Sequence, residues 1–361
     1  QLLYTRTGST PVAPASTAKL MTAAAVLLAR GAGYRITTTV VADDAGTIAL
    51  VGGGDPTLTA AAAGQVGAYA DAARLSDLAK QVAAAKVPIS RIVVDDSLFL
   101  GPSVSPKWAA DDVPTSYAAP ITAAMADGGR DTATAVVRSS TPDLAAGRQL
   151  AALLGTPNLP VVLQTAPAGA RVVATVHSAP MSTLVDQMLQ NSDNVIAECL
   201  ARQVALATDR PASFTGAADA TRSVLASAGV DPGAGMVDGS GLAAADRVSP
   251  ATLTSVLRLA AGPAHPDLHD LVIGLPVAGW SGTLADRYMS GSATKGAGTV
   301  RAKTGTLTGV SSLAGLVHDV DGRLLAFAFV ADRVPNSDAG TVAAEAALDR
   351  IAATLAGCGC R

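Results

Sequence analysis

Charged side chains are scarce in this sequence. They make up 15% of the 361 residues, the formal net charge is −3, and no run of five like charges occurs. A protein that binds nucleic acid needs a dense cluster of basic side chains to neutralise phosphate groups. The composition therefore excludes nucleic acid as an expected partner.

Long apolar runs are also missing. The longest strongly apolar stretch, Leu20–Ala29, is about half as long as the ~20 residues that a membrane-spanning helix requires. No basic leader with a cleavage site precedes it, and the chain begins within an apolar run, Gln1–Tyr4, without an initiator methionine. We therefore expect a membrane contact only through a segment that this chain lacks.

Cysteine is rare and is not arranged as in metal sites. Cys199, Cys358 and Cys360 show no ligand-type spacing to a histidine, so neither a metal nor another cofactor is predicted. The simplest interpretation is three buried or idle thiols. The alternative is a disulfide between Cys358 and Cys360, because disulfides persist outside the cytoplasm, although so small a ring is strained.

The hydrophobic pattern of the first half predicts a central helix followed by mixed elements. Apolar residues surround Ser16–Arg30 on all sides, which is typical of a helix that runs through the middle of a core. Alternation, turn residues and helical periodicity then predict an α+β unit. Its elements are strands at 35–41, 47–51 and 91–94, a glycine turn at 52–56, a helix over 68–85 and an irregular stretch at 101–120.

The second half predicts two helices and then a meander capped by a helix. Apolar residues after Pro180 recur at helical spacing from Met181 to Leu189, and Val195–Leu206 shows the same period. Later segments alternate as strands do, and the last is amphipathic. These are strands at 299–306, 311–318 and 324–331 and a helix at 342–355.

Ser16 and Lys19 form a candidate nucleophile and base. They lie three residues apart at the start of the first predicted helix, so their side chains share one face and can touch. A serine hydroxyl needs a base to take its proton, and burial in an apolar core lowers the pKa of a lysine. The helix N-terminus would also favour developing negative charge at Ser16. Taken alone, this spacing is common by chance.

Two further motifs have both a structural and a functional interpretation. Ser192-Asp193-Asn194 lies between two predicted helices, where all three residue types are frequent caps. Lys303-Thr304-Gly305 lies late in a predicted strand, where a glycine weakens pairing unless another backbone comes close. The functional interpretation is an edge strand that accepts an extended peptide, with Lys303 attracting a carboxylate. The structural one is a surface lysine beside a turn.

The three motifs together resemble those of penicillin-binding proteins and class A β-lactamases. About 170 residues separate Lys19 from Ser192, far more than one helical lobe needs, so a whole unit is inserted there. This arrangement is similar to the low-molecular-mass class C penicillin-binding proteins, the D-Ala-D-Ala carboxypeptidase/endopeptidase family. Further segments similar to that family's signatures are 50–58, 127–130, 193–198, 238–242 and 282–284.

The resemblance implies an α/β (α+β) fold. A transpeptidase/β-lactamase-like domain, with an antiparallel sheet flanked by helices plus a helical lobe, would comprise residues 1–34 and 176–361. One or two accessory domains would occupy residues 35–175, between the first and second motifs. The chain lacks the family's first sheet strand and its export segment.

The resemblance also implies a serine D,D-peptidase that hydrolyses peptidoglycan stem peptides through an acyl-enzyme on Ser16, is inhibited covalently by β-lactams and acts outside the cytoplasm, in the periplasm or after secretion. Lys19 would be the base, Ser192 the proton relay, and Asn194 a ligand of the peptide carbonyl and of Lys19. The remaining residues implied for substrate binding are Lys303, Thr304, Gly305 and Thr306, with the backbone N–H groups of Ser16 and Thr306 as oxyanion hole.

The irregular segment of the insert contains Trp108 and Asp111, which have two interpretations. In the functional one, suggested by the resemblance, Trp108 covers the substrate stem and Asp111 pairs with the free amine of a diaminopimelate-type side chain. In the structural one, Trp108 covers a small core and Asp111 is merely solvated. The sequence leaves both open.

Other classes of function are also weighed. No Gly-x-Ser-x-Gly motif occurs and the glycine turn at 52–54 is not followed by Gly-Lys-Ser/Thr, which excludes a Ser-His-Asp hydrolase of that type and a phosphate loop. A β-lactamase and a non-catalytic penicillin-binding or wall-binding module stay open. Rapid penicillin turnover would indicate the first, and stable acylation without release of D-alanine the second.

Overall fold

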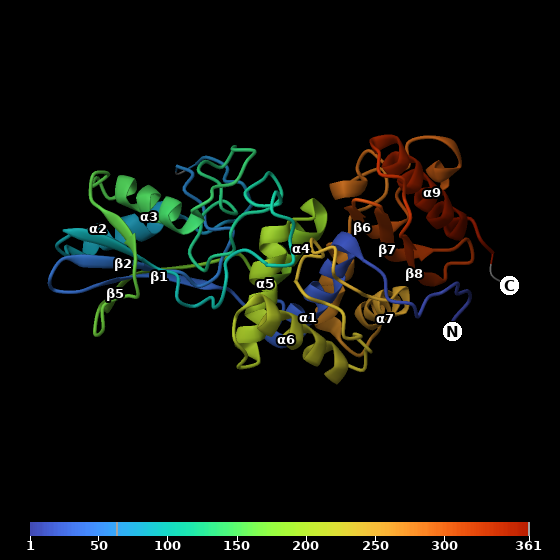
Figure 1. Cartoon of the computed structure of the whole chain (residues 1–361), viewed down its shortest axis with the longest axis horizontal. Helices are drawn as coiled ribbons and strands as arrows, with labels where there is room; N and C mark the ends of the chain where they lie inside the picture. The colour runs from blue at the N-terminus through green and yellow to red at the C-terminus, as the bar shows by residue number, and fades with distance from the viewer. Residues whose placement is uncertain (63, 360–361) are drawn as a thin grey trace.

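The computed structural model describes residues 1–62 and 64–359. Its elements form two parts, one built around a five-stranded sheet and the other combining helices with a three-stranded sheet. Figure 1 shows the chain beginning in the second part, leaving it after α1 for the five-stranded sheet, and returning at α4. The mixed α/β architecture predicted from the sequence is confirmed.

The five-stranded sheet has the order β4-β3-β2-β1-β5. β1 pairs antiparallel with β2 and β5, whereas β3 pairs parallel with β2 and β4. Alternate apolar residues such as Ile48 and Leu50 pack against Leu78 of α2 and Leu150 of α3, so this part has its own core. The bounds are β1 Thr37–Ala42, β2 Thr47–Val51, β3 Arg91–Asp95, β4 Val161–Leu163, β5 Arg171–His177, α2 Leu75–Ala85 and α3 Pro142–Leu153.

A bundle of helices surrounds α1 (Lys19–Arg30). The side chains of α1 from Leu20 to Leu27 are buried on every face because neighbouring helices cover it all round. A 3-10 turn, η1 (Ala15–Ala18), leads into it. The other helices of the bundle are α4 Met181–Asn191, α5 Asn194–Ala207, α6 Phe214–Ser227, α7 Pro250–Ala261, η2 Pro266–Leu268 and α8 His269–Ile273.

The three-stranded sheet is an antiparallel meander of β6 (Arg301–Leu307), β7 (Val310–His318) and β8 (Leu324–Ala331). Helix α9 (Asp338–Ala356) packs on it, capped by the Ser337 hydroxyl. Two short turns, η3 (Gly282–Leu284) and η4 (Gly291–Gly296), precede it. β6 is the edge strand, so its outer side can meet the helical bundle.

Most predicted elements are confirmed with small shifts at their ends, but the helix predicted over Ala68–Ala85 is wrong at its start. The helix begins at Leu75, and Asp71 has a left-handed backbone with φ of 56°. Tyr69 points into a polar cluster beside α5, so residues 68–74 are held by tertiary contacts instead of helical ones.

Two predictions remain untested. The domain division, with residues 1–34 and 176–361 catalytic and 35–175 inserted, stays a proposal. A disulfide between Cys358 and Cys360 cannot be described, because Cys360 lies outside the described residues. Within residues 1–62 and 64–359, no helix combines the length and apolar character required to cross a bilayer.

Candidate active site

Ser16 and Lys19 are brought together at the junction of η1 and α1. The Lys19 ammonium lies 2.9 Å from Ser16 Oγ and also donates to Asn194 Oδ1 at 2.5 Å and to the Ser240 carbonyl at 2.8 Å. Lys19 is fully buried, whereas Ser16 is half-buried and reachable from solvent. Ser16 is therefore the exposed member of a pair whose base is sheltered.

Burial lowers the pKa of Lys19 enough for it to act as a base near neutral pH. Loss of hydration lowers its pKa to about 8, although the negative charges of Asp238 and Asp193 oppose this shift. About a tenth of the molecules then carry a neutral Lys19 at pH 7, against about one in a few thousand for an ordinary lysine. Lys19 can therefore accept the Ser16 proton near neutral pH.

Ser192 and Lys303 form a second serine–lysine pair. Ser192 ends α4 with a left-handed backbone, φ 53°, and its Oγ accepts a 2.9 Å hydrogen bond from Lys303 Nζ on β6. Lys303 is fully buried, and its pKa lies well below the usual range because of burial and the positive charges of Lys19 and Arg287. A substrate carboxylate arriving here would favour the charged form of Lys303 again.

Asn194, the first residue of α5, joins Lys19 to the segment that contains Tyr117. Its Oδ1 holds Lys19, and its Nδ2 donates to the carbonyl of Tyr117 at 3.2 Å. Asp193 is the N-cap, accepting from the backbone N–H groups of Val195 and Ile196. The capping interpretation of this motif is thus right for Asp193, and it leaves Ser192 and Asn194 facing the site.

The outer edge of β6 faces Ser16. Ala302 donates its N–H away from β7, to the carbonyl of Pro276, at 2.9 Å. Because N–H directions alternate along a strand, those of Thr304 and Thr306 point to the same outer edge. A side chain on Gly305 would place its Cβ 2.9 Å from the Ser16 nitrogen. The backbone of Ser16 therefore lies close to β6 at Gly305.

The hydroxyls of Thr304 and Thr306 already have protein partners. Thr304 donates to Thr283 Oγ1 at 2.8 Å, and Thr306, which is exposed, donates to Glu345 at 3.0 Å. Either hydroxyl can exchange its partner for a carboxylate. Thr283 belongs to a segment that resembled a family signature, but its position beside Thr304 could not be read from the sequence.

The turn at 238–242 binds Lys19 through the carbonyl of Ser240. Asp238 accepts four hydrogen bonds, three from the backbone N–H groups of Ser240, Gly241 and Ala243 and one from the Trp108 indole at 2.8 Å. Gly241 has φ of 77°, and a Cβ there would lie 2.0 Å from the carbonyl of Ala15. The turn therefore packs against η1 and fixes the Ser240 carbonyl on Lys19.

Trp108 and Asp111 lie in different surroundings. Trp108 is 7% exposed and meets the Phe214 ring edge to face at 5.2 Å, so its burial favours the structural interpretation. Asp111 is exposed. The same segment reaches the site through Tyr117, whose carbonyl contacts Asn194 and whose hydroxyl donates to Asp112.

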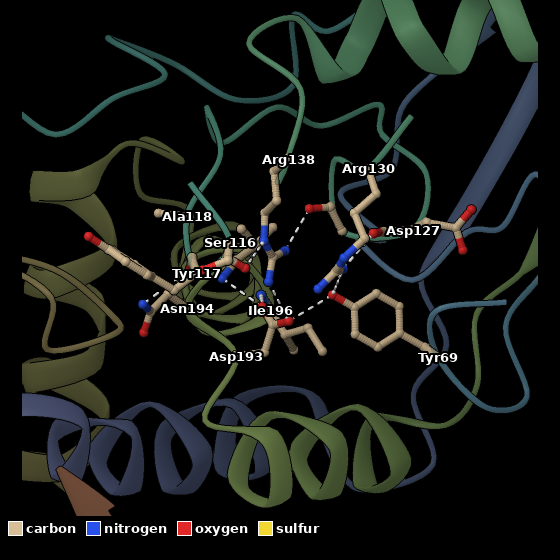
Figure 2. A network of polar contacts seen from close by, with 12 residues as sticks. Tyr69, Ser116, Tyr117, Ala118, Asp127, Arg130, Arg138, Asp193, Asn194 and Ile196 are labelled. Atoms are coloured by element: carbon tan, nitrogen blue, oxygen red, sulfur yellow. Dashed lines mark hydrogen bonds and ion pairs between the residues drawn. The ribbon is translucent and has the colours of Figure 1, made fainter. Parts of the chain in front are cut away.

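A buried polar network connects the insert to the second motif (Figure 2). Arg138 forms a 2.8 Å ion pair with Asp193, and the Tyr69 hydroxyl donates to the same carboxylate oxygen at 2.7 Å. Burial alone would raise the pKa of Asp193, but Arg138 and the hydrogen bonds lower it to about 2. Asp193 therefore stays charged. Sequence reasoning missed Tyr69 and Arg138, since neither lies in a motif.

A serine in contact with a buried lysine, a second serine–lysine pair and an edge strand beside them suit the class of hydrolases that act through a serine nucleophile. The chain belongs to the D-Ala-D-Ala carboxypeptidase 3 (S13) family, whose sequence profile matches residues 1–140 and 130–355. It is accordingly a serine-type D-Ala-D-Ala carboxypeptidase, a hydrolase.

Individual proteins similar to this chain support the family assignment. A carboxypeptidase of Mycobacterium tuberculosis is 45% identical over 100% of this chain and 78% of its own length. The crystal structure of penicillin-binding protein 4 from Haemophilus influenzae is similar with a TM-score of 0.81 and 25% identity, covering 99% of this chain and 94% of that one. A predatory peptidoglycan endopeptidase from Bdellovibrio bacteriovorus, 16% identical over 98% of this chain and 89% of that one, shares the fold with a TM-score of 0.60.

Proposed function

We propose that this protein hydrolyses D-alanyl-D-alanine bonds of peptidoglycan stem peptides, at free stem ends and in D,D cross-links, through an acyl-enzyme on Ser16. The observation that carries the proposal is the pair of 2.9 Å contacts, Lys19 Nζ to Ser16 Oγ and Lys303 Nζ to Ser192 Oγ. They supply a nucleophile with its base and a separate proton donor within one opening.

Acylation follows from this geometry. Neutral Lys19 takes the Ser16 proton, and Oγ attacks the carbonyl carbon of the penultimate D-alanine. The oxyanion accepts hydrogen bonds from the backbone N–H groups of Ser16 and Thr306, and such donors are typically worth about 3 kcal/mol each. The C–N bond then breaks as Ser192 passes its proton to the leaving amine and takes one from protonated Lys303.

Substrate binding uses the edge strand. An extended peptide lying along β6 would place its terminal carboxylate at Lys303, Thr304 and Thr306, while Gly305 lets the backbones of β6 and Ser16 approach. Asn194 would bind the peptide carbonyl. Water then attacks the ester carbonyl and its proton returns through Ser192 to Lys303. Oγ of Ser16 leaves with the proton that Lys19 holds, and the shortened peptide is released.

A β-lactam would acylate Ser16 by the same route. Penicillin-binding protein 4 of Haemophilus influenzae has been crystallised with a β-lactam, and that structure is 27% identical to this chain with a TM-score of 0.71, covering 96% of this chain and 92% of that one. Ring opening leaves the amine attached to the acyl group, so it can block water. Since the substrate lies in the cell envelope, the proposal places the protein outside the cytoplasm, periplasmic or secreted, with any membrane anchor in a segment beyond this chain.

Asp111 is part of the proposal as a ligand for a free amine on the stem peptide. Its exposure, on a segment that reaches Asn194 through Tyr117, supports this role. Asp111→Ala should lower kcat/KM about tenfold to a hundredfold for peptides with that amine. Equal loss for peptides without it would make Asp111 structural.

The test of the proposed function is incubation with muropeptides of defined cross-linking, with products separated by mass. Release of D-alanine from monomers, and conversion of dimers to monomers, should both disappear in Ser16→Ala. If wild-type protein released neither product while penicillin still labelled it stably, the chain would bind but not hydrolyse.

A further inference from the structure

A pocket of about 320 Å³ opens beside Ser192. The insert contributes Tyr69, Arg130 and Arg138 to its lining, and the end of α4 contributes Asn191 and Ser192. Figure 2 shows both guanidinium groups pointing toward the Asp193 and Tyr69 oxygens. Because Ser192 is also the partner of Lys303, the pocket adjoins the catalytic opening.

The two arginines differ in whether a carboxylate neutralises their charge. Arg138 is buried and donates to Asp193, Gly128 and Ser116, so its charge is balanced by Asp193. Arg130 is half-buried and donates through Nη1 to the Asp127 carbonyl at 2.8 Å and to the Tyr69 hydroxyl at 3.2 Å. Among residues 1–62 and 64–359 no carboxylate pairs with Arg130, and its Nε and Nη2 have no hydrogen-bond partner.

Neither acidic neighbour in sequence forms an ion pair with Arg130: Asp131, the next residue, is exposed, and Asp127 is occupied elsewhere. The carboxylate of Asp127 is turned into the insert, where it accepts hydrogen bonds from Thr59 and from the N–H groups of Ala60 and Ala68. The pocket therefore keeps one guanidinium charge in excess. Two hydrogen bonds and a contact with the Tyr69 ring hold this guanidinium, and donors are left for a ligand. A planar guanidinium of this kind suits a carboxylate.

We propose that this pocket binds a carboxylate of the leaving peptide, with Arg130 as the residue that selects cross-linked substrates. The inference rests on the proposed function, in which Ser192 passes a proton to the leaving amine, because that role puts the pocket on the leaving-group side. A single D-alanine carries one carboxylate, and Lys303 receives it. A leaving stem peptide carries further carboxylates, and one of them reaches Arg130.

The test compares two substrates in each variant. The measured quantity is the ratio of kcat/KM for a cross-linked dimer to kcat/KM for a monomeric pentapeptide. Arg130→Gln should lower this ratio about tenfold to a hundredfold, and Arg130→Lys should keep most of it. Arg171→Gln, at an exposed position of the insert, is the matched control and should leave the ratio unchanged.

A second measurement uses the wild-type protein alone, in case the Arg130 variants fold poorly. Dimers whose leaving stem keeps the carboxylate next to the scissile amine, but has its other carboxylates amidated, should be cleaved at least tenfold less efficiently than dimers with all carboxylates free. Equal cleavage of the two dimers, or an unchanged ratio in Arg130→Gln, would overturn the proposal. Failure of the proposed function itself would look different, because wild-type protein would then cleave neither monomer nor dimer.

Discussion

At the scale of single residues, two buried lysines have different tasks. Lys19 lies against Ser16, the proposed nucleophile, and Lys303 against Ser192, the proposed proton relay, and each lysine has lost its hydration. The fall in pKa matters most for Lys19, because a base must be neutral before it can accept a proton.

The rate of acylation should therefore depend on pH through Lys19, whose pKa is about 8. Below that pH the neutral fraction rises about tenfold per unit of pH, and above it the fraction approaches one. The second-order rate constant for acylation by a penicillin, measured by stopped flow between pH 5 and 9.5, should rise and then level off near pH 8. A flat profile would show that another group is the base.

Gly305 should not tolerate a side chain. A Cβ there would lie 2.3 Å from Ser312 Oγ and 2.9 Å from the Ser16 nitrogen, and the second neighbour is backbone that cannot rotate away. Gly305→Ala should slow acylation about tenfold to a hundredfold by pushing β6 from Ser16, with a loss of about 1–3 kcal/mol in unfolding free energy.

The matched control is Gly33→Ala, since no heavy atom lies within 4 Å of a Cβ at Gly33. Acylation rates and urea unfolding of both variants provide the comparison. Equal behaviour of the two variants would mean that β6 and Ser16 are not in close contact.

The residues of the three motifs could be predicted from sequence because the spacing of residues within each motif indicates their chemistry. Serine and lysine one helical turn apart, or a glycine in a strand, are visible without a structure. Arg138 was not predictable, because it meets Asp193 across 55 residues of chain and its own neighbourhood has no recurring pattern.

At the scale of elements, the start of α5 depends on the insert. Asp193 caps α5 through one oxygen and holds Arg138 and Tyr69 through the other. The cap thus fixes the positions of Ser192 and Asn194, which flank Asp193 in the chain. The same contacts explain why the predicted helix over Ala68–Ala85 fails at its start, since Tyr69 serves this network.

Arg138→Met should destabilise the fold strongly. It would leave Asp193 buried without its counter-charge, and breaking a buried pair in this way costs about 3–5 kcal/mol. Acylation of Ser16 should also slow, because the end of α4 and the start of α5 lose their anchor. Urea unfolding and penicillin acylation measure the two effects.

Arg148→Met serves as control, because Arg148 is an exposed residue of α3, and it should change neither quantity by more than about 0.5 kcal/mol or twofold. If Arg138→Met were as stable as that control, the ion pair would contribute little. Lost stability with full acylation would mean that the anchor does not position the motif.

At the scale of the whole molecule, residues 35–175, the proposed insert, contact the candidate active site instead of standing apart from it. Three hydrogen bonds make this connection: Arg138 bonds to Asp193, Tyr117 to Asn194 and Trp108 to Asp238. The distance between the first two motifs and the resemblance predicted an insert, but these contacts join segments far apart in the chain and had no local signal.

Trp108→Phe tests the contact between Trp108 and Asp238. The substitution keeps an aromatic ring but removes the hydrogen bond to Asp238, which should lower unfolding free energy by about 1–3 kcal/mol and slow penicillin acylation and peptide hydrolysis to a similar degree. Trp280→Phe, at a residue that is 80% exposed, should leave stability unchanged. A loss confined to peptide hydrolysis would instead support a Trp108 that touches substrate.

The central claim is that Ser16 carries the acyl group during hydrolysis. Intact-mass measurement after incubation with a penicillin, followed by peptide mapping, tests it most directly when D-alanine release from a pentapeptide is assayed on the same samples. The account predicts one adduct per chain, located on Ser16, and loss of both adduct and D-alanine release in Ser16→Ala. An adduct on another residue, or release that survives in Ser16→Ala, would contradict it.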